Sequence, residues 1–195
     1  MAAETESVDA QHDGEASRIA RLRHLFPSGA TAAAVAVAGV ALAATSLAVQ
    51  GFNGHGLIGV VLGPVLALLT AIDLRHRLLP NLIVLPATAV VTAIVAASKP
   101  GNLVGHLVAG AVFAGVLLGA ALLSRAGVGM GDVKLALLIG IALGGQTTTA
   151  VFVTAAASLA VGVVVLVREG RAGLNKTIAY GPLLALGALV AYFSS

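Results

Sequence analysis

The sequence contains no cysteine and no tryptophan, and only 10% of its 195 residues are charged. Without cysteine, the chain can form no disulfide and has no thiol nucleophile and no cysteine-bearing zinc module. A soluble domain normally carries about 25% charged residues. Here 58% of the residues are hydrophobic and the mean hydropathy is +1.03. This composition is that of an integral membrane protein.

Acidic residues are also scarce, and most of them lie at the N-terminus. Beyond Glu15 the chain contains only three acids, Asp73, Asp132 and Glu169. Glu169 lies in a polar Arg-Glu-Gly-Arg stretch, where we expect it to be solvated. Asp73 and Asp132 are flanked by apolar runs, so any acid chemistry in the apolar part of the chain must draw on them.

Seven apolar runs follow the polar N-terminal segment. They cover residues 30–50, 56–72, 81–98, 103–124, 133–145, 147–167 and 177–193. Each run is near the roughly 20 residues that cross about 30 Å of hydrocarbon, except the fifth, which is short. The sequence therefore predicts an all-α, polytopic membrane protein with about seven transmembrane helices.

The segment ahead of the first run differs from the rest of the chain. Residues 1–17 are acidic and contain too few large apolar groups to fold alone, whereas residues 18–26 resemble an interfacial helix. We predict a cytoplasmic tail with an interfacial helix (1–29), an uncleaved transmembrane anchor (30–50) and a six-helix core (56–193). The first run is longer than the core of a signal peptide, so an anchor is preferred to a removed signal.

Basic residues fall on alternate connections between the apolar runs. They are Arg18, Arg21, Arg23, Arg75, Arg77, Arg125, Lys134, Arg168, Arg171 and Lys176. The intervening connections hold only Lys99. By the positive-inside rule, this alternation predicts a cytoplasmic N-terminus and an external C-terminus. The same clusters account for the isoelectric point near 9.8, and we expect no nucleic-acid partner.

This topology brings Asp73 and Asp132 to the same, cytoplasmic, membrane face. The runs 56–72 and 103–124 both go from outside to inside and end just before one of the two acids. An aspartate at membrane depth costs several kcal/mol, so a chain that keeps two of them on one face is expected to use them. Two close carboxylates share a proton: one can deprotonate water while the other donates to a carbonyl oxygen. We predict that Asp73 and Asp132 form a catalytic pair that hydrolyses peptide bonds.

A glycine-rich stretch leads into the second acid. Gly127, Gly129 and Gly131 can adopt positive φ and approach an extended peptide closely, which would hold the scissile bond beside Asp132. Lys134 is a candidate for steering a peptide carbonyl. Two structural alternatives stay open: a tight turn with a helix that begins at Asp132, capped by its carboxylate, and a Lys134 that serves only as a topological anchor.

Two proline-containing pairs mark other boundaries. Pro80-Asn81 is expected to start the third helix, with Asn81 free to cap it. Gly181-Pro182 is expected to break the last helix, either opening space at the site or forming a packing kink.

Three stretches carry a resemblance to a known family. They are Asp73 with the downstream Pro80-Asn81, the stretch Gly-Met-Gly-Asp-Val-Lys-Leu at 129–135, and the stretch Ile-Ala-Tyr-Gly-Pro-Leu-Leu-Ala-Leu-Gly at 178–187. Together they resemble the type IV prepilin peptidases, membrane aspartic endopeptidases with a glycine-x-glycine-aspartate motif. The resemblance covers about residues 56–193.

The resemblance implies that Asp73 and Asp132 are the catalytic pair. Such an enzyme removes a short basic leader from prepilin or pilin-like precursors at the cytoplasmic face of the cell membrane. Many members also N-methylate the new N-terminus through a cysteine-bearing insertion. Because this chain has no cysteine, it resembles the short, peptidase-only form. The sequence does not indicate an oligomeric state.

Other functions are weighed against this one. His76 follows Asp73, whereas His55 and His106 lie near the opposite face, so no three-ligand metal set is expected, and we expect no cofactor. A proton-coupled transporter would use Asp73 and Asp132 as a relay nearer the bilayer midplane. A presenilin-like intramembrane protease would carry its active aspartate deeper in a helix than Asp73.

Overall fold

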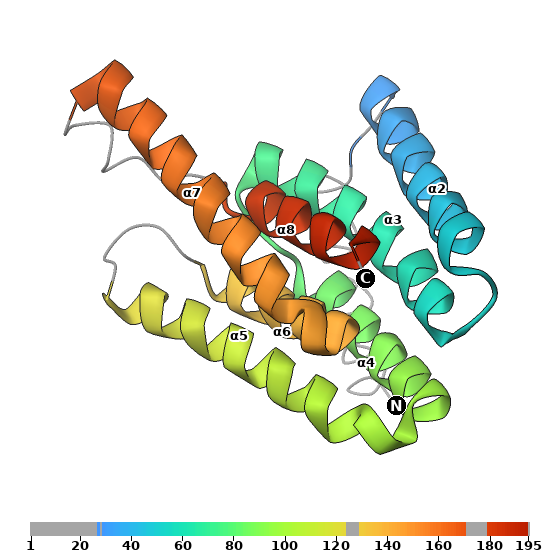
Figure 1. Ribbon diagram of the computed structural model, residues 1–195. Helices are drawn as coiled ribbons and strands as arrows, with labels where there is room; N and C mark the ends of the chain where they lie inside the picture. The colour runs from blue at the N-terminus through green and yellow to red at the C-terminus, as the bar shows by residue number, and fades with distance from the viewer. Residues whose placement is uncertain (1–26, 28, 124–128, 171–178, 195) are drawn as a thin grey trace, which may run out of the picture.

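The computed structural model describes residues 27, 29–123, 129–170 and 179–194, and these residues form helices and short connections, with no strand among them (Figure 1). The α-helices are α2 (Ala30–Gln50), α3 (Gly54–His76), α4 (Asn81–Ser98), α5 (Leu103–Leu123), α6 (Met130–Leu143), α7 (Thr147–Glu169) and α8 (Gly181–Phe193). Two short 3₁₀ helices, η1 (Pro100–Asn102) and η2 (Gly144–Gln146), connect α4 to α5 and α6 to α7. The all-α prediction is confirmed; the predicted tail and interfacial helix lie outside the described residues.

Several of these helices are long and apolar enough to cross a membrane. By length and composition there are five candidate spans in the described part of the chain: Ala30–Gln50, Gly54–His76, Asn81–Ser98, Pro100–Leu122 and Met130–Arg168. The last is a 39-residue stretch that contains both α6 and α7, and α8 is a shorter apolar helix. The exact number of crossings and the side of the N-terminus therefore stay predictions.

The helix ends follow from local sequence. Asn53 caps α3, because its Oδ1 accepts a hydrogen bond from the Gly56 N–H at 3.0 Å. Pro80 is the N-cap of α4, so the predicted start of that helix at Pro80-Asn81 is confirmed. Gly144 ends α6 with φ of 56°, a left-handed conformation that glycine adopts easily.

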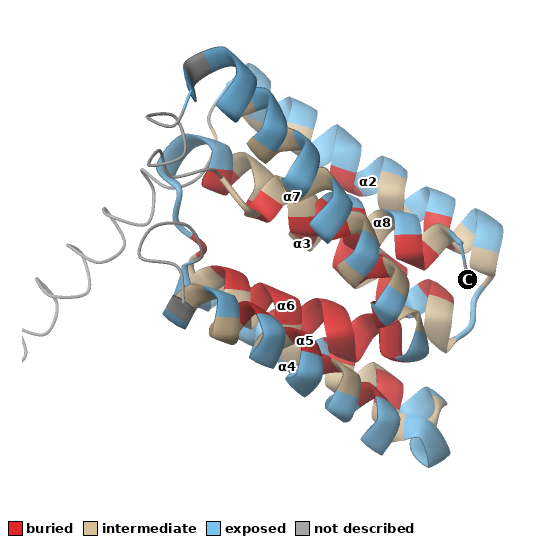
Figure 2. Ribbon diagram, turned by 60° about the vertical axis from the view of Figure 1, so that its left-hand side comes forward, coloured by how far each residue is buried: buried red, intermediate tan, exposed pale blue. Residues whose placement is uncertain are grey.

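Helices α3 and α6 lie at the centre of the packing. α3 packs against α2, α4 and α8, whereas α6 packs against α4, α5 and α8. Figure 2 shows that buried positions concentrate on α3, α6 and α8, while the outer faces of α2, α5 and α7 are exposed. The two acids of the apolar part are thus carried by the two central helices.

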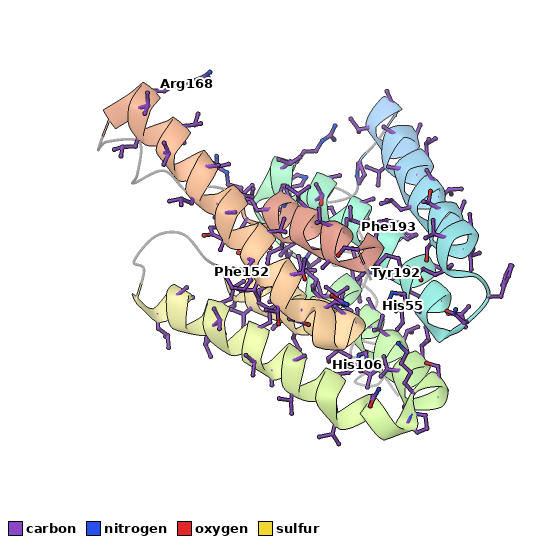
Figure 3. All side chains as sticks on the ribbon, viewed as in Figure 1. His55, His106, Phe152, Arg168, Tyr192 and Phe193 are labelled. Carbon is purple, nitrogen blue, oxygen red and sulfur yellow. The ribbon has the colours of Figure 1, made fainter. Side chains whose placement is uncertain are left out.

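The start of α3 is held to the ends of α2 and α8 by a small polar cluster. The Tyr192 hydroxyl donates to the carbonyl oxygen of His55 at 2.9 Å, and the ring of His55 stacks on that of Tyr192 (Figure 3). The Ser46 hydroxyl lies within hydrogen-bond distance of the Gly56 carbonyl, at 3.0 Å, and of the Tyr192 hydroxyl, and it can donate its single proton to either. This cluster lies at the opposite end of α3 from Asp73.

Candidate active site

Asp73 lies near the C-terminal end of α3 and is only 5% exposed. Its Oδ2 accepts a hydrogen bond from the backbone N–H of Gly181, the first residue of α8, at 2.8 Å. Arg75, two residues further on, donates a hydrogen bond to the Thr31 hydroxyl at 2.8 Å. A buried carboxylate is thus held by a second, distant helix.

Asp132 occupies the third position of α6 and is 7% exposed. Its Oδ2 accepts a hydrogen bond from the Gly129 N–H at 2.9 Å, while its own N–H donates to the Gly129 carbonyl at 3.0 Å. The helix therefore begins at Met130, with Gly129 as N-cap, rather than at Asp132. Asp132 supplies the reciprocal half of a capping box, a role open to an acid at this position.

Both carboxylates line one cavity of about 290 Å³. Its lining residues are Asp73, Arg77, Leu78, Leu79, Asn81, Gly129, Met130, Gly131, Asp132 and Lys134. A larger cavity of about 670 Å³ lies between α5 and α7, but its lining is mostly apolar and includes neither acid. The smaller cavity is therefore the candidate site.

The two described motif glycines act differently from what the sequence predicts. Neither Gly129, with φ of −84°, nor Gly131 is among the glycines with positive φ, and Gly127 lies outside the described residues. A Cβ at position 131 would come within 2.7 Å of the Leu79 Cβ. Gly131 is thus needed because the first turn of α6 packs closely on the connection between α3 and α4.

Lys134 contacts the start of α4. Its ammonium donates a hydrogen bond to the Asn81 Oδ1 at 2.8 Å. Asn81, the first residue of α4, thus bridges to α6 and does not have the capping role that its position predicts. The bond joins α4 to α6 beside the cavity and holds Lys134 at the edge of the cavity.

Comparison with known proteins identifies the family. A family model described as type IV leader peptidase family matches residues 60–166, more than half of the chain and the part that carries both acids. The chain belongs to the type IV leader peptidase family. Because the chain belongs to this family and has several helices long and apolar enough to cross a membrane, it is a multi-pass membrane protein.

Two curated proteins are similar over most of the chain. Both are prepilin leader peptidase/N-methyltransferases of Burkholderia pseudomallei, from strains 1026b and K96243. Each is 33% identical over 181 residues, which cover 89% of this chain and 58% of the relative. The chain thus spans little more than half the length of these relatives. No solved structure matches.

The family resemblance found in the sequence is therefore confirmed, but two residues of the site were not predicted from it. Arg77, which we assigned to topology, lines the cavity and ends α3 in a left-handed conformation, with φ of 50° and ψ of 40°. A non-glycine residue in this conformation is strained by about 1 kcal/mol or more and is often found at functional sites. No feature of the sequence signals that conformation.

Gly181 is the second such residue. The sequence predicts that Gly181-Pro182 breaks the last helix, but α8 begins at Gly181, with Pro182 in its first turn. The prediction of a break is wrong because proline is well tolerated in the first turn, where its missing N–H has no intrahelical partner. Two signals in the sequence pointed to the site: the third resembling stretch contains Gly181, and one interpretation of Gly181-Pro182 was that it opens space at the site.

His55 and His106 contact different partners in the fold. The His106 Nδ1 is hydrogen-bonded to the Ile141 carbonyl at 2.7 Å, whereas His55 stacks on Tyr192 (Figure 3). Among the residues that the structure describes, no group of three or more His, Cys, Asp or Glu side chains is arranged to hold a metal ion.

Proposed function

We propose that this protein is a membrane aspartic endopeptidase that removes the short basic leader from prepilin or pilin-like precursors. The observation that carries the proposal is the burial of Asp73 and Asp132, from two central helices, on one cavity. Membership of the type IV leader peptidase family supports it, as does the similarity to two proteins described as prepilin leader peptidases.

In the proposed reaction, the two carboxyl groups share one proton. The anionic carboxylate takes a proton from water as the water oxygen attacks the scissile carbonyl carbon, and the neutral carboxyl donates its proton to the carbonyl oxygen. The resulting diol then breaks its C–N bond. The leaving nitrogen takes the proton from the first carboxyl, and a diol hydroxyl returns a proton to the second. Neither step needs a cofactor.

We assign substrate positioning to Gly129, Gly131 and Lys134. The N–H and C=O of Gly129 are both engaged with Asp132, so the contribution of Gly129 is the absence of a side chain beside that carboxylate. Gly131 sets the approach of α6 to Leu79. Lys134 donates one hydrogen bond to Asn81, and an ammonium has two further donors for a peptide carbonyl.

The proposed topology has seven crossings, a cytoplasmic N-terminus and an active site that faces the cytoplasm, in the cell membrane. Three basic residues lie at the same ends of α3 and α6 as the two acids: Arg75, Arg77 and Lys134. This placement fits the positive-inside rule. Since the chain has no cysteine, the proposal does not include N-methylation through a cysteine-bearing segment.

The positions of the acids favour this function over the alternatives. Asp73 lies in the last turns of α3 and Asp132 in the first turn of α6. A transporter relay would need acids nearer the midplane. A presenilin-like protease would need an aspartate deeper in its helix than Asp73.

The test is leader cleavage in membranes. A candidate precursor from the same source is co-expressed with the parent protein, with the Asp73→Asn variant or with the Asp132→Asn variant. The size and the new N-terminus of the precursor are then determined. We expect both substitutions to lower cleavage by at least about 1,000-fold, because each removes one half of a proton-sharing pair. Glu169→Gln, which neutralises the third acid of the apolar part at the end of α7, serves as matched control.

The outcomes separate the hypotheses. Loss of cleavage in both aspartate variants, with membrane levels unchanged and with Glu169→Gln active, supports the peptidase and locates the cut. Processing that persists in both variants rules out the pair as catalyst.

A further inference from the structure

We propose that Gly181 is a positioning residue of the active site, and that its backbone amide fixes the orientation of the Asp73 carboxylate toward the cavity. The inference rests on the proposed peptidase function. Gly181 itself is outside the segment that the family model matches and does not line the cavity. It acts through Asp73, which does line the cavity.

The first turn of α8 leaves the backbone amide of Gly181 for Asp73. Pro182 has no N–H, and the N–H groups of Leu183 and Leu184 both donate to the Tyr180 carbonyl at 3.1 Å. The side chain of Tyr180, the N-cap residue, makes no capping hydrogen bond. The amide of Gly181 is aimed at Asp73 instead, at 2.8 Å. Asp73 thus caps α8 from another helix, where a carboxylate is favoured by the helix dipole.

The space around Gly181 is also limited. Gly181 is buried, and a Cβ at this position would come within 2.8 Å of the Asp73 Oδ2 and within 3.1 Å of its Cβ and Cγ. Any side chain at position 181 would therefore push the carboxylate away from its present place. Glycine is the residue that allows both the short hydrogen bond and the close contact between helices α3 and α8.

The hydrogen bond from Gly181 also determines which oxygen of Asp73 can take part in catalysis. The hydrogen bond engages Oδ2 of Asp73, which leaves Oδ1 to act on water or on the shared proton. Because the bond is shielded from solvent and one partner is a carboxylate, it holds the side chain more firmly than an exposed bond would. Misplacing a reacting group by about 1 Å can lower a rate by about 100-fold.

The experiment compares Gly181→Ala with Gly162→Ala, which places the same methyl group on α7 in open space. Steady-state cleavage of the precursor is measured in membranes with matched protein levels. We expect Gly181→Ala to lower kcat by about 10- to 100-fold with KM within about twofold of the parent. Gly162→Ala should match the parent. A kcat for Gly181→Ala equal to that of Gly162→Ala overturns the proposal.

A second measurement covers the case in which Gly181→Ala folds poorly. The same substitution is made in Asp73→Ala, which removes the oxygen and the Cγ that the new methyl group would meet and keeps only the contact with the Cβ. If the Asp73 contact is the cause, Gly181→Ala should lower the unfolding temperature in detergent clearly less in the Asp73→Ala background than in the parent. Equal destabilisation of both backgrounds by Gly181→Ala overturns the proposal.

The two proposals fail in distinguishable ways. If the parent cleaves the precursor, and Asp73→Asn does not, while Gly181→Ala retains the parental kcat, then Gly181 has no positioning role and the peptidase function stands. If Asp73→Asn and Asp132→Asn both still process the precursor, the peptidase function itself is wrong, whatever Gly181→Ala does.

Discussion

At the scale of single residues, Gly131 shows how the motif fixes the site before any substrate is present. It lies where the first turn of α6 meets Leu79, which is 8% exposed, and a Cβ there would come within 2.7 Å of the Leu79 Cβ. Asp132 is the next residue. A displacement of the first turn of α6 would therefore move the carboxylate as well.

We expect Gly131→Ala to destabilise the protein by about 1–3 kcal/mol, as overpacking of a buried contact does. In an open helix the same change stabilises by up to about 1 kcal/mol, because alanine is the better helix former. Gly115→Ala on α5, where a Cβ meets nothing within 4 Å, is the matched control. The readout is the thermal unfolding midpoint in detergent, and a midpoint for Gly131→Ala at or above that of Gly115→Ala would contradict this account.

At the scale of elements, the bond from Lys134 to Asn81 joins α6 to α4 at the edge of the cavity. Two roles of Lys134 can be separated here: it holds the two helices together, and in the proposed function it also steers the substrate. Asn81→Ala removes only the first role, whereas Lys134→Met removes both.

We therefore expect Asn81→Ala to lower kcat/KM by about 2- to 10-fold, which corresponds to the 0.5–1.5 kcal/mol of a typical hydrogen bond. Lys134→Met should lower it further. The double variant should be no worse than Lys134→Met alone, because the shared bond is already lost. Effects that multiply in the double variant would show that the two residues act separately.

The elements themselves could be predicted well, and the reason is physical. The apolar runs 30–50 and 81–98 coincide with α2 and α4, because an uninterrupted apolar stretch has to satisfy its backbone within a helix. The start of α6 was missed by three residues, since Gly129 and Asp132 cap each other. A reciprocal cap of this kind is visible in a sequence only when the helix start is already known.

The site could be predicted only in part. Asp73 and Asp132 stood out because acids are rare in the apolar chain, and the alternation of basic clusters set them on one face. The bond from Gly181 to Asp73 joins residues 108 positions apart, and no periodicity or local pattern encodes such a contact. The left-handed conformation of Arg77 depends on how α3 meets α4, which local sequence does not reveal either.

At the scale of the whole molecule, the fold separates two ends. One end carries the C-terminus of α3 and the N-termini of α6 and α8, which meet around Asp73 and Asp132. The other end carries the cluster of Ser46, His55 and Tyr192, which ties α2, α3 and α8 together. Since membrane helices gain little from hydrophobic burial against one another, such hydrogen bonds and close contacts hold them in place.

The proposed orientation of these ends can be tested because the chain has no cysteine, so a single introduced cysteine is the only thiol. We expect a membrane-impermeant maleimide to label Phe52→Cys and Gly101→Cys in intact spheroplasts. Phe52 is 88% exposed at the α2–α3 connection, and Gly101 lies in η1 with open space around it. His76→Cys, exposed at the active-site end of α3, should be labelled only after lysis. Labelling of His76→Cys in intact spheroplasts, with Phe52→Cys protected, would place the active site outside, where a basic leader that stays in the cytoplasm could not reach it.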